Sequence, residues 1–189
     1  MLPEPIKKFV DSFAKLPGIG PRQATRLAYH IANLGKGEVF EIARSVNGLG
    51  ELSGCSLCFL TTPNKELCGI CSDPSRNPKL IAIVEKETDL ISLEKTKRFN
   101  GRYLVLGDLK KDGVLNALQK IRLRTVSDAN EVILAISPTT YGDLNSTIIA
   151  QELKDSAKKI TRLGRGIPTG GEIEFADEET LTGALDNRS

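Results

Sequence analysis

The stretch CSLCFLTTPNKELCGIC spans residues 55–71 and contains all four cysteines of the 189-residue chain. They form two Cys-x-x-Cys pairs, and residues 59–67 separate the pairs. One such turn aims two thiolates at a single point, so two turns can supply the four sulfur ligands of a tetrahedral Zn²⁺. Four protein ligands leave no position for water, so the ion would be structural and would fold a segment with few apolar groups. The sequence therefore predicts one structural Zn²⁺ per chain, bound by Cys55, Cys58, Cys68 and Cys71.

A redox dithiol and a pair of disulfides are the alternatives for these cysteines. A redox motif would use one Cys-x-x-Cys at a strand-to-helix junction. Disulfides require an oxidising compartment, and residues 1–10 contain two prolines and no apolar segment of the kind found in secretion signals. No apolar run approaches the roughly 18 residues of a membrane helix. We therefore expect a cytoplasmic protein without membrane association, in which the cysteines bind metal.

Composition alone identifies no partner. The chain is 40% hydrophobic and 26% charged, which is ordinary for a globular protein. Its formal net charge of +2 is too small to indicate nucleic-acid binding. Any such role must come from a local cluster of basic side chains.

Two helices around a tight turn are predicted upstream of the cysteines. Apolar residues recur at helical spacing on both sides of LPGIGP, residues 16–21. Gly18 and Gly20 permit a sharp turn and a close approach of the backbone to a partner, and Pro21 suits the first position of the second helix. An amphipathic segment at residues 39–46 would complete a small helical domain. The pattern is typical of a helix-hairpin-helix motif, and a plain helical hairpin is the alternative.

The start of the second helix offers a site for phosphate. Its first amides lack helical partners, and the positive end of the helix dipole lies there. Arg22 and Arg26, four residues apart, lie on the polar side of this helix, and contacts of this kind hold DNA without reading its sequence. Lys7, Lys8 and Lys15 would extend the basic surface, whereas His30 is expected to pack rather than to act in catalysis. We therefore expect a DNA-binding site formed by Gly18, Gly20, Arg22 and Arg26.

The second half of the chain alternates short apolar runs with helical patterns. Strands that alternate with helices predict right-handed crossovers and a mainly parallel sheet. The apolar runs are LIAIVE (80–85), YLVLG (103–107), EVILAIS (131–137) and KKITRLG (158–164), and the helical patterns cover 88–97, 114–124 and 145–158.

Two acidic residues follow strands of this predicted sheet. Glu85 ends the first strand, and Asp143 lies in the expected loop after the third. Function in such sheets gathers at the carboxyl ends of strands, where two carboxylates can hold Mg²⁺ for phosphoryl chemistry. The alternative is that both are solvated loop acids. Because no nucleophile is paired with a base, a Mg²⁺-dependent nuclease or primase-like enzyme is the second hypothesis, after a protein without catalytic activity.

The order of these motifs resembles the RecR family of bacterial recombination mediator proteins. The resemblance runs from about Lys7 to Arg188. The matching stretches are LPGIGPRQATRLAYHI, the cysteine pairs with CSDPSRN, IAIVEKETDLISLEKT, GRYLVLG, EVILAISPTT and ITRLGRGIPTGGEIEFADEETLTGALDNR.

The resemblance implies a mixed α/β protein in four parts. A Toprim fold is implied for the α/β half, and the C-terminal tail is implied to join subunits, with Asp177 capping a short terminal helix. The implied parts are a helical helix-hairpin-helix DNA-binding domain (1–54), a C4 zinc finger (55–72), a Toprim-like α/β domain (79–165) and a C-terminal oligomerisation tail (166–189).

The resemblance also implies a function without catalysis. Family members form homo-oligomers, as dimers, tetramers or rings, that clamp single- or double-stranded DNA. They act with RecO and RecF to load RecA onto gapped DNA coated by single-strand-binding protein. A member would lie in the bacterial cytoplasm, at the nucleoid.

This chain departs from the family pattern in two places. The family usually has a loop with Ser-Pro and Gly-Pro after the position of Gly107, whereas this chain continues directly with DLKKDGVLNAL. The family commonly has Glu-Gly-Glu where this chain has Tyr141-Gly142-Asp143. Only one carboxylate remains there, which weakens a Mg²⁺ site. Whether Glu85 and Asp143 hold an ion or contact a partner is left open by the sequence.

Overall fold

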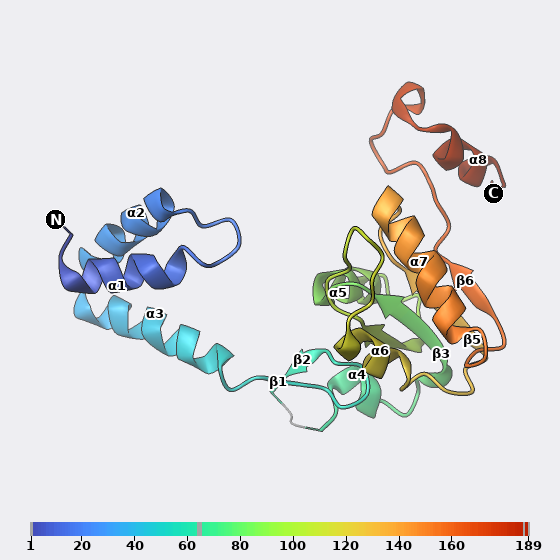
Figure 1. The fold of residues 1–189 in the computed structure, drawn as a ribbon, viewed down its shortest axis with the longest axis horizontal. Coiled ribbons are helices and arrows are strands. Elements are labelled where there is room, and N and C mark those ends of the chain that lie inside the picture. The colour runs from blue at the N-terminus through green and yellow to red at the C-terminus, as the bar shows by residue number, and fades with distance from the viewer. Residues whose placement is uncertain (1, 64–65, 187, 189) are drawn as a thin grey trace. The chain divides into compact units, whose positions relative to one another are not determined.

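The computed structural model describes residues 2–63, 66–186 and 188 (Figure 1). The chain divides into two compact units between Leu52 and Ser53. Within the described ranges, no helix is long and apolar enough to cross a membrane. The first unit, here the helical unit, contains α1 (Glu4–Phe13), α2 (Pro21–Ala32) and α3 (Lys36–Leu49).

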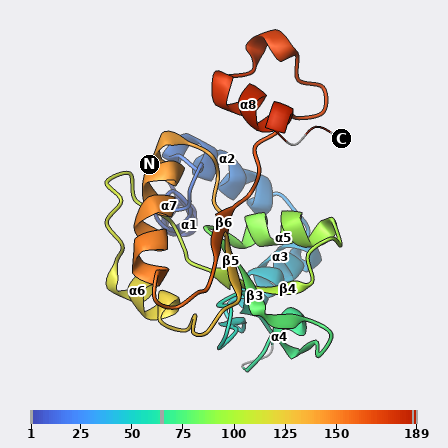
Figure 2. The same cartoon turned by 90° about the vertical axis from the view of Figure 1, so that its right-hand side faces the viewer.

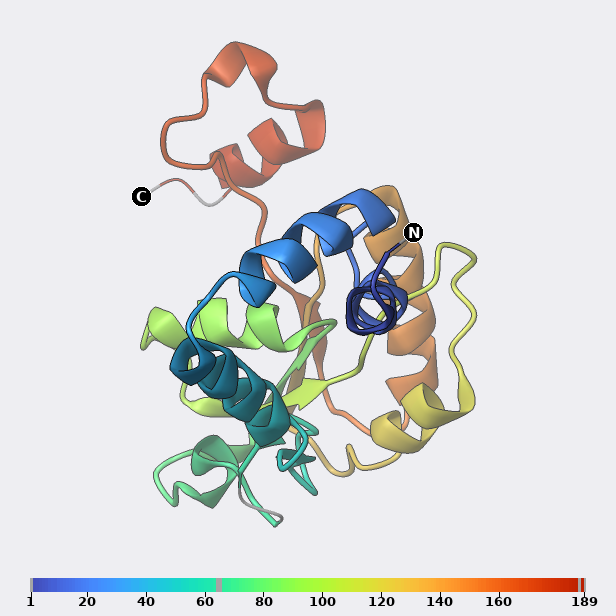
Figure 3. The same ribbon diagram turned by 90° about the vertical axis from the view of Figure 1, so that its left-hand side faces the viewer.

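In the helical unit, α1 and α2 form the predicted hairpin, and Figure 3 shows it with α1 seen nearly end-on. Pro21 occupies the first position of α2, as the sequence predicts. The hairpin buries Ile6 of α1 against Ala24 and Ala28 of α2. Phe9 and Phe13 lie on the same helix as Ile6, and their stacked rings have centroids 3.9 Å apart. Small alanines on α2 let the two helices approach closely.

The second unit, here the body, begins with a small cysteine-containing lobe and continues into an α/β domain. The lobe contains the antiparallel pair β1 (Ser53–Gly54) and β2 (Thr61–Thr62), followed by α4 (Gly69–Ser72). The main sheet has strand order β4-β3-β5-β6 and is parallel throughout. Its strands are β3 (Asn77–Val84), β4 (Gly101–Val105), β5 (Glu131–Ala135) and β6 (Ile160–Arg162). The helices are α5 (Glu87–Lys95), α6 (Ala117–Leu123), α7 (Thr140–Leu153), the 3-10 turn η1 (Ile173–Phe175) and α8 (Glu178–Asp186).

Helices cover both faces of the main sheet, as Figure 2 shows for α5 on one side and for α6 and α7 on the other. The face under α6 and α7 holds the larger core, with Ile83, Leu134 and Ile149 buried at its centre. The face under α5 holds a smaller core around Leu90 and Val84. The continuous apolar runs seen in the sequence follow from this arrangement, because strands covered on both faces need apolar side chains at every position.

Two helix starts differ from those expected, and both differences come from capping. The helix expected from residue 114 begins only after Asn116, whose side chain accepts the amide N–H of Gln119 at 2.9 Å. The helix expected from residue 145 begins at Thr140, because the Thr139 hydroxyl accepts the amide N–H of Gly142 at 3.1 Å. The placement of Asp143 in a loop is therefore wrong, since Asp143 lies in the first turn of α7.

The terminal helix α8 begins where the sequence predicts. The Asp177 carboxylate accepts the amide N–H of Thr180 at 2.9 Å and its hydroxyl at 2.8 Å, so it caps α8. Hydrogen bonds from Thr180 lower the pKa of Asp177, which keeps the capping group ionised.

Candidate functional site

The four cysteine side chains meet in one buried cluster in the lobe. Their sulfur atoms all lie within 4.8 Å of one another, and those of Cys58 and Cys68 are 3.4 Å apart. A zinc–sulfur bond of about 2.3 Å gives sulfur–sulfur distances of about 3.8 Å in a tetrahedron, so the donor set fits the ion. The sequence prediction that these four residues come together is confirmed, and the cluster can bind a metal ion.

The protonation of the cluster suits cation binding. Burial raises the pKa of Cys55, but hydrogen bonds from the backbone of Cys58, Cys68 and Leu57 outweigh it and bring this pKa down to about 6. In contrast, a hydrogen bond with Cys71, together with burial, raises the pKa of Cys58. Four close thiols cannot all ionise without a cation, so metal binding must release protons and must weaken at low pH.

The lobe is attached to the α/β domain by contacts at the end of the first cysteine pair. The amide N–H of Val105 donates to the Cys58 carbonyl at 2.9 Å, which ties the first Cys-x-x-Cys turn to β4. The guanidinium of Arg122 lies 4.8 Å from the ring centroid of Phe59, which adopts a positive φ of 63° directly after Cys58. Since these contacts involve the turn itself, the position of the cysteines depends on β4 and α6 of the α/β domain.

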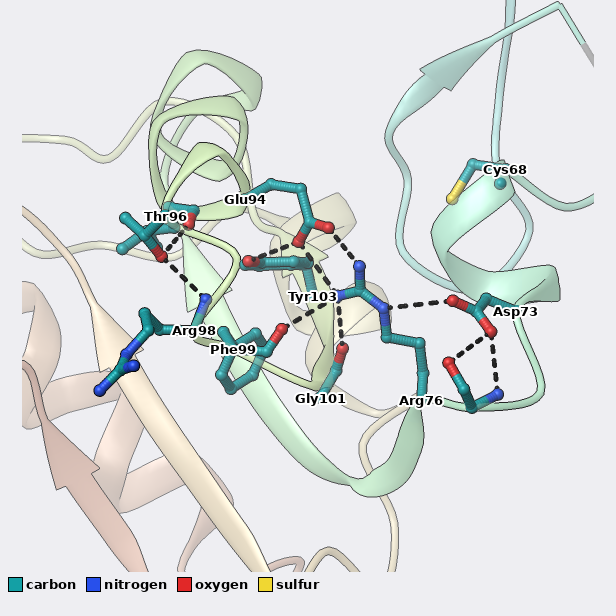
Figure 4. A network of polar contacts seen from close by, with 12 residues as sticks. Cys68, Asp73, Arg76, Glu94, Thr96, Arg98, Phe99, Gly101 and Tyr103 are labelled. Atoms are coloured by element: carbon teal, nitrogen blue, oxygen red, sulfur yellow. Dashed lines mark hydrogen bonds and ion pairs between the residues drawn. The ribbon is translucent and has the colours of Figure 1, made fainter.

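A polar network around Arg76 attaches the exit of the lobe to the same domain (Figure 4). The Arg76 guanidinium forms a two-point ion pair with Glu94 of α5 and donates to the carbonyls of Phe99 at 3.2 Å and Gly101 at 3.3 Å. The Tyr103 hydroxyl donates to Oε2 of Glu94 at 3.0 Å, an oxygen that Arg76 also contacts. The hydrogen bond from Arg76 is the main cause that lowers the pKa of Glu94. One side chain thus joins the lobe, α5 and the start of β4.

The hairpin turn of the helical unit has the geometry that its glycines predict. Gly18 has a φ of +76°, a left-handed conformation that favours glycine, and the Ile19 amide donates to the Leu16 carbonyl at 3.1 Å. Gly20 caps α2, and no heavy atom lies within 4 Å of the position where its Cβ would stand. The backbone at the start of α2 is therefore open to a partner.

Arg22 and Arg26 are both exposed on α2, on the side away from the buried alanines. Among the described residues, neither forms an ion pair, so both guanidinium groups are available to an anion. Arg26 borders an open groove of about 550 Å³ that also contacts Gly18 and His30. His30 was expected to pack beside the apolar stripe rather than to act in catalysis; its side chain is exposed on this groove, which Leu27 also lines.

Glu85 lies at the carboxyl end of β3, as predicted. Its carboxylate accepts the amide N–H of Leu109 at 3.1 Å, and its carbonyl accepts the amide N–H of Gly107 at 2.9 Å. Gly107 has a φ of +90°, so the chain turns sharply there. The chain between Gly107 and Leu109 therefore folds directly over Glu85, and the Leu109 amide occupies one oxygen of its carboxylate.

Asp143 is held by two arginines that the sequence interpretation missed. Arg165 donates to both carboxylate oxygens at 2.9 Å, and Arg162 donates to one of them at 3.3 Å. Arg165 also pairs with Glu179 of α8, which connects the tail to α7. A Mg²⁺ ion at Asp143 would have to displace these guanidinium groups.

The two predicted acidic residues are not joined into one site. No hydrogen bond or ion pair connects Glu85 with Asp143 in the part of the chain that the structure describes. The four cysteines are the only group of three or more candidate metal ligands found there. The basic stretch ITRLGR contained a signal for the missed arginines, since Arg162 ends the last strand of the sheet, β6, and Arg165 follows it.

Comparisons with known proteins agree with this architecture. The family model described as RecR, helix-hairpin-helix matches residues 6–48, the Toprim domain model matches residues 79–164, and the model described as RecR, C-terminal matches residues 166–189. Proteins named Recombination protein RecR from two strains of Clostridium perfringens are each 41% identical to this chain over 193 residues, and the alignments cover 99% of this chain and 97% of theirs. Since the likeness spans the hairpin, the cysteine cluster, the Toprim domain and the tail, the chain belongs to the RecR family.

Proposed function

We propose that the protein is a DNA-binding recombination protein that acts in recombinational repair without catalysis. The observation that carries this proposal is the full-length likeness to proteins named Recombination protein RecR, combined with an exposed hairpin turn that presents Arg22 and Arg26. The likeness indicates the process, recombination, and the exposed hairpin indicates the ligand, DNA; neither observation alone indicates both.

DNA binding would occur at the start of α2. The open backbone around Gly20 and the first amides of the helix suit one phosphate, and Arg22 and Arg26 suit neighbouring phosphates. These contacts do not read bases, so single- and double-stranded DNA would both bind. Because each contact releases counterions, affinity would fall steeply with salt.

The cysteine cluster would hold one structural Zn²⁺ within a finger at residues 55–72. Zinc is supported by four buried thiols at tetrahedral spacing, a donor set that matches structural zinc sites. All four ligands are sulfur, so the ion would have no open position for water and no catalytic role.

Self-assembly would let weak contacts hold DNA. Helix α3 buries none of its residues and leaves the side chains of Phe40, Val46 and Leu49 exposed, which supports burial against another copy. The tail, residues 166–189, exposes Ile173 and Phe175 and is the second candidate for subunit contacts. A closed homo-oligomer around the strand would trap DNA topologically. In this state it would act with RecO and RecF in loading RecA at the nucleoid.

The proposal is tested first by replacing Arg22 and Arg26 together with Ala. Each charged contact contributes about 1 kcal/mol, so DNA affinity should fall about 30-fold at low salt. The slope of log affinity against log salt for a duplex should decrease by about 1.8. Fluorescence anisotropy with a labelled duplex measures both. The matched control replaces Lys36 and Arg44 of α3, which removes the same charge elsewhere in the helical unit.

Two results would contradict the proposal. Wild-type affinity in the Arg22/Arg26 double variant at low salt would remove the hairpin from DNA binding. Cleavage of labelled DNA with Mg²⁺ or Mn²⁺ that disappears in Glu85→Gln would instead identify a Toprim nuclease. We expect no cleavage, because Asp143 is engaged by two arginines.

A further inference from the structure

Arg102 occupies an unusual position on β4, the edge strand of the main sheet. Side chains alternate along a strand, so Arg102 points away from its neighbour Tyr103, whose hydroxyl reaches Glu94 on the α5 face. Arg102 therefore lies on the face that contains the larger core, beside Leu104. An arginine at the border of an apolar core normally has a carboxylate or a carbonyl as its partner.

No such partner is present among the described residues. The Nε atom of Arg102 is buried and has no hydrogen-bond partner, and no ion pair or hydrogen bond reaches its other nitrogens from the ranges described. In contrast, Arg76 and Arg165 are each satisfied by carboxylates. Partial burial of an unpaired guanidinium costs free energy, so the position calls for an anion from outside the unit.

Arg102 lines a small pocket of about 190 Å³ at the border between the lobe and the sheet. Apolar residues such as Ile81 and Leu104 line it too, together with two hydroxyl residues, Thr125 and Ser127. The Thr125 hydroxyl already donates its hydrogen to the Arg122 carbonyl at 2.7 Å. The Ser127 hydroxyl can donate its hydrogen to a bound anion. No carboxylate of the described chain lines the pocket, and Cys71 of the cysteine cluster contributes one thiol to its wall.

The two acidic residues that follow pocket-lining residues most closely in the sequence, Asp73 after Cys71 and Asp128 after Ser127, do not compensate Arg102. Asp73 is engaged by Ser75 and Arg76, and Asp128 is paired with Lys79 at 2.6 Å. A phosphate in the pocket would therefore meet a guanidinium and a hydroxyl without a competing carboxylate. A planar guanidinium beside a hydroxyl donor is suited to phosphate oxygens.

We propose that this pocket binds a phosphate of the DNA backbone. Arg124, which is exposed immediately before Thr125, and Lys120 one turn earlier on α6 continue the positive charge outward, which fits a polyanion better than an isolated anion. The inference rests on the proposed DNA binding and adds a contact located in the body, separate from the hairpin of the helical unit. The body would then retain weak affinity for DNA when the hairpin arginines are removed.

The test compares Arg102→Gln with the wild-type full-length protein on a labelled duplex. Loss of one phosphate contact should weaken binding about five- to tenfold at low salt and decrease the salt slope by about 0.9. The same decrease should appear in the Arg22→Ala/Arg26→Ala background, where the remaining affinity depends on the body. Arg98→Gln is the matched control, because Arg98 is an exposed arginine of the same unit without an ion pair in its described surroundings.

A second measurement separates a phosphate contact from a role in folding. Phenylglyoxal modifies free guanidinium groups, so bound duplex should protect Arg102 of the wild type from modification, as read by peptide mass spectrometry, and should leave Arg98 reactive. Unchanged affinity in Arg102→Gln, or equal modification of Arg102 with and without DNA, would overturn the inference. Loss of bound zinc in Arg102→Gln without DNA protection would overturn it too, since Arg102 would then serve the cysteine cluster. If the wild type bound no DNA at all, the proposed function itself would fail.

Discussion

The helical unit and the body use their apolar residues in opposite ways. Among its described residues, the helical unit buries only Ile6, Ala24 and Ala28, whereas Phe40 and Leu49 of α3 remain 66% and 67% exposed. The body instead buries a continuous set of strand and helix side chains on both faces of its sheet. Buried apolar area is the main favourable contribution to folding, so most of the stability of this chain lies in the body.

This difference separates two tasks. The body has the contacts of a rigid scaffold, since the cysteine lobe is tied to β4 through Cys58 and to α5 through Arg76. The helical unit leaves apolar and basic surface unpaired, which costs stability in isolation and suits it to binding partners. The predictions below test whether the two units differ in stability as their packing indicates.

The largest effect is expected from removing one ligand of the cysteine cluster. Cys68→Ser should abolish metal binding and unfold the lobe, because structural zinc contributes on the order of 10 kcal/mol to the folding of such segments. Hydrogen exchange should rise across residues 53–76 while the amides of α1 and α2 keep their protection. Zinc is measured by mass spectrometry of the native protein.

Two comparisons make that result specific. Ser72→Ala changes an exposed residue next to the ligand Cys71 and should leave zinc content unchanged. Chelation of the wild type should reproduce the effect of Cys68→Ser. A variant that lost zinc and kept the lobe protected would show that the body holds these residues without metal.

Much of this architecture could be predicted from local sequence patterns. Apolar runs bounded by turns identified all four strands of the main sheet, because a strand buried on both faces must be apolar throughout. The LPGIGP turn predicted the first helical position at Pro21. The predicted helix starts were less accurate. The apolar periodicity placed them at residues 114 and 145, whereas the side chains of Asn116 and Thr139 cap α6 and α7 and so fix where these helices begin.

Tertiary ion pairs could not be predicted in the same way. The spacing of the cysteines was enough to identify the cluster, because both pairs aim at one point. The partners of Asp143 come from β6 and from the segment after it, and a single sequence contains no rule for that pairing. Arg76 and Glu94 are likewise joined only by the folding of the lobe onto α5.

The next largest effect is expected at Arg76. Arg76→Met should destabilise the body by about 2–3 kcal/mol, because it leaves Glu94 unpaired and removes donors from the carbonyls of Phe99 and Gly101. Arg98→Met is the matched control, since the Arg98 guanidinium points away from this network in Figure 4. Urea unfolding measures both variants. Equal midpoints would mean that the network adds nothing to the attachment of the lobe.

The stabilisation by Arg76 should also depend on pH. The hydrogen bond from Arg76 is the main cause that holds the pKa of Glu94 below 4.5 in the folded protein. A lowered carboxyl pKa stabilises the fold above the unfolded value and loses that contribution as pH falls through the folded value. The difference in unfolding free energy between wild type and Arg76→Met should therefore be constant near pH 7 and decrease below about pH 4.5. A difference that grew in acid would contradict this assignment.

The smallest expected effect tests the turn of the helical unit. Gly18→Ala should destabilise this unit by about 1 kcal/mol, because an L-residue at a φ of +76° is strained even though open space surrounds the added Cβ. Gly48→Ala in α3 also meets no atom within 4 Å, but it replaces a helical glycine and should stabilise by about 0.5–1 kcal/mol. Opposite signs for two glycines in equally open space would show that backbone conformation, not packing, decides the stability of this thinly packed unit. Hydrogen exchange of the α1 and α2 amides, recorded as the temperature rises, measures the stability change in both variants.

If both variants were destabilised alike, the added methyl groups would have to meet another surface. The helical unit would then be less exposed in solution than its own packing indicates.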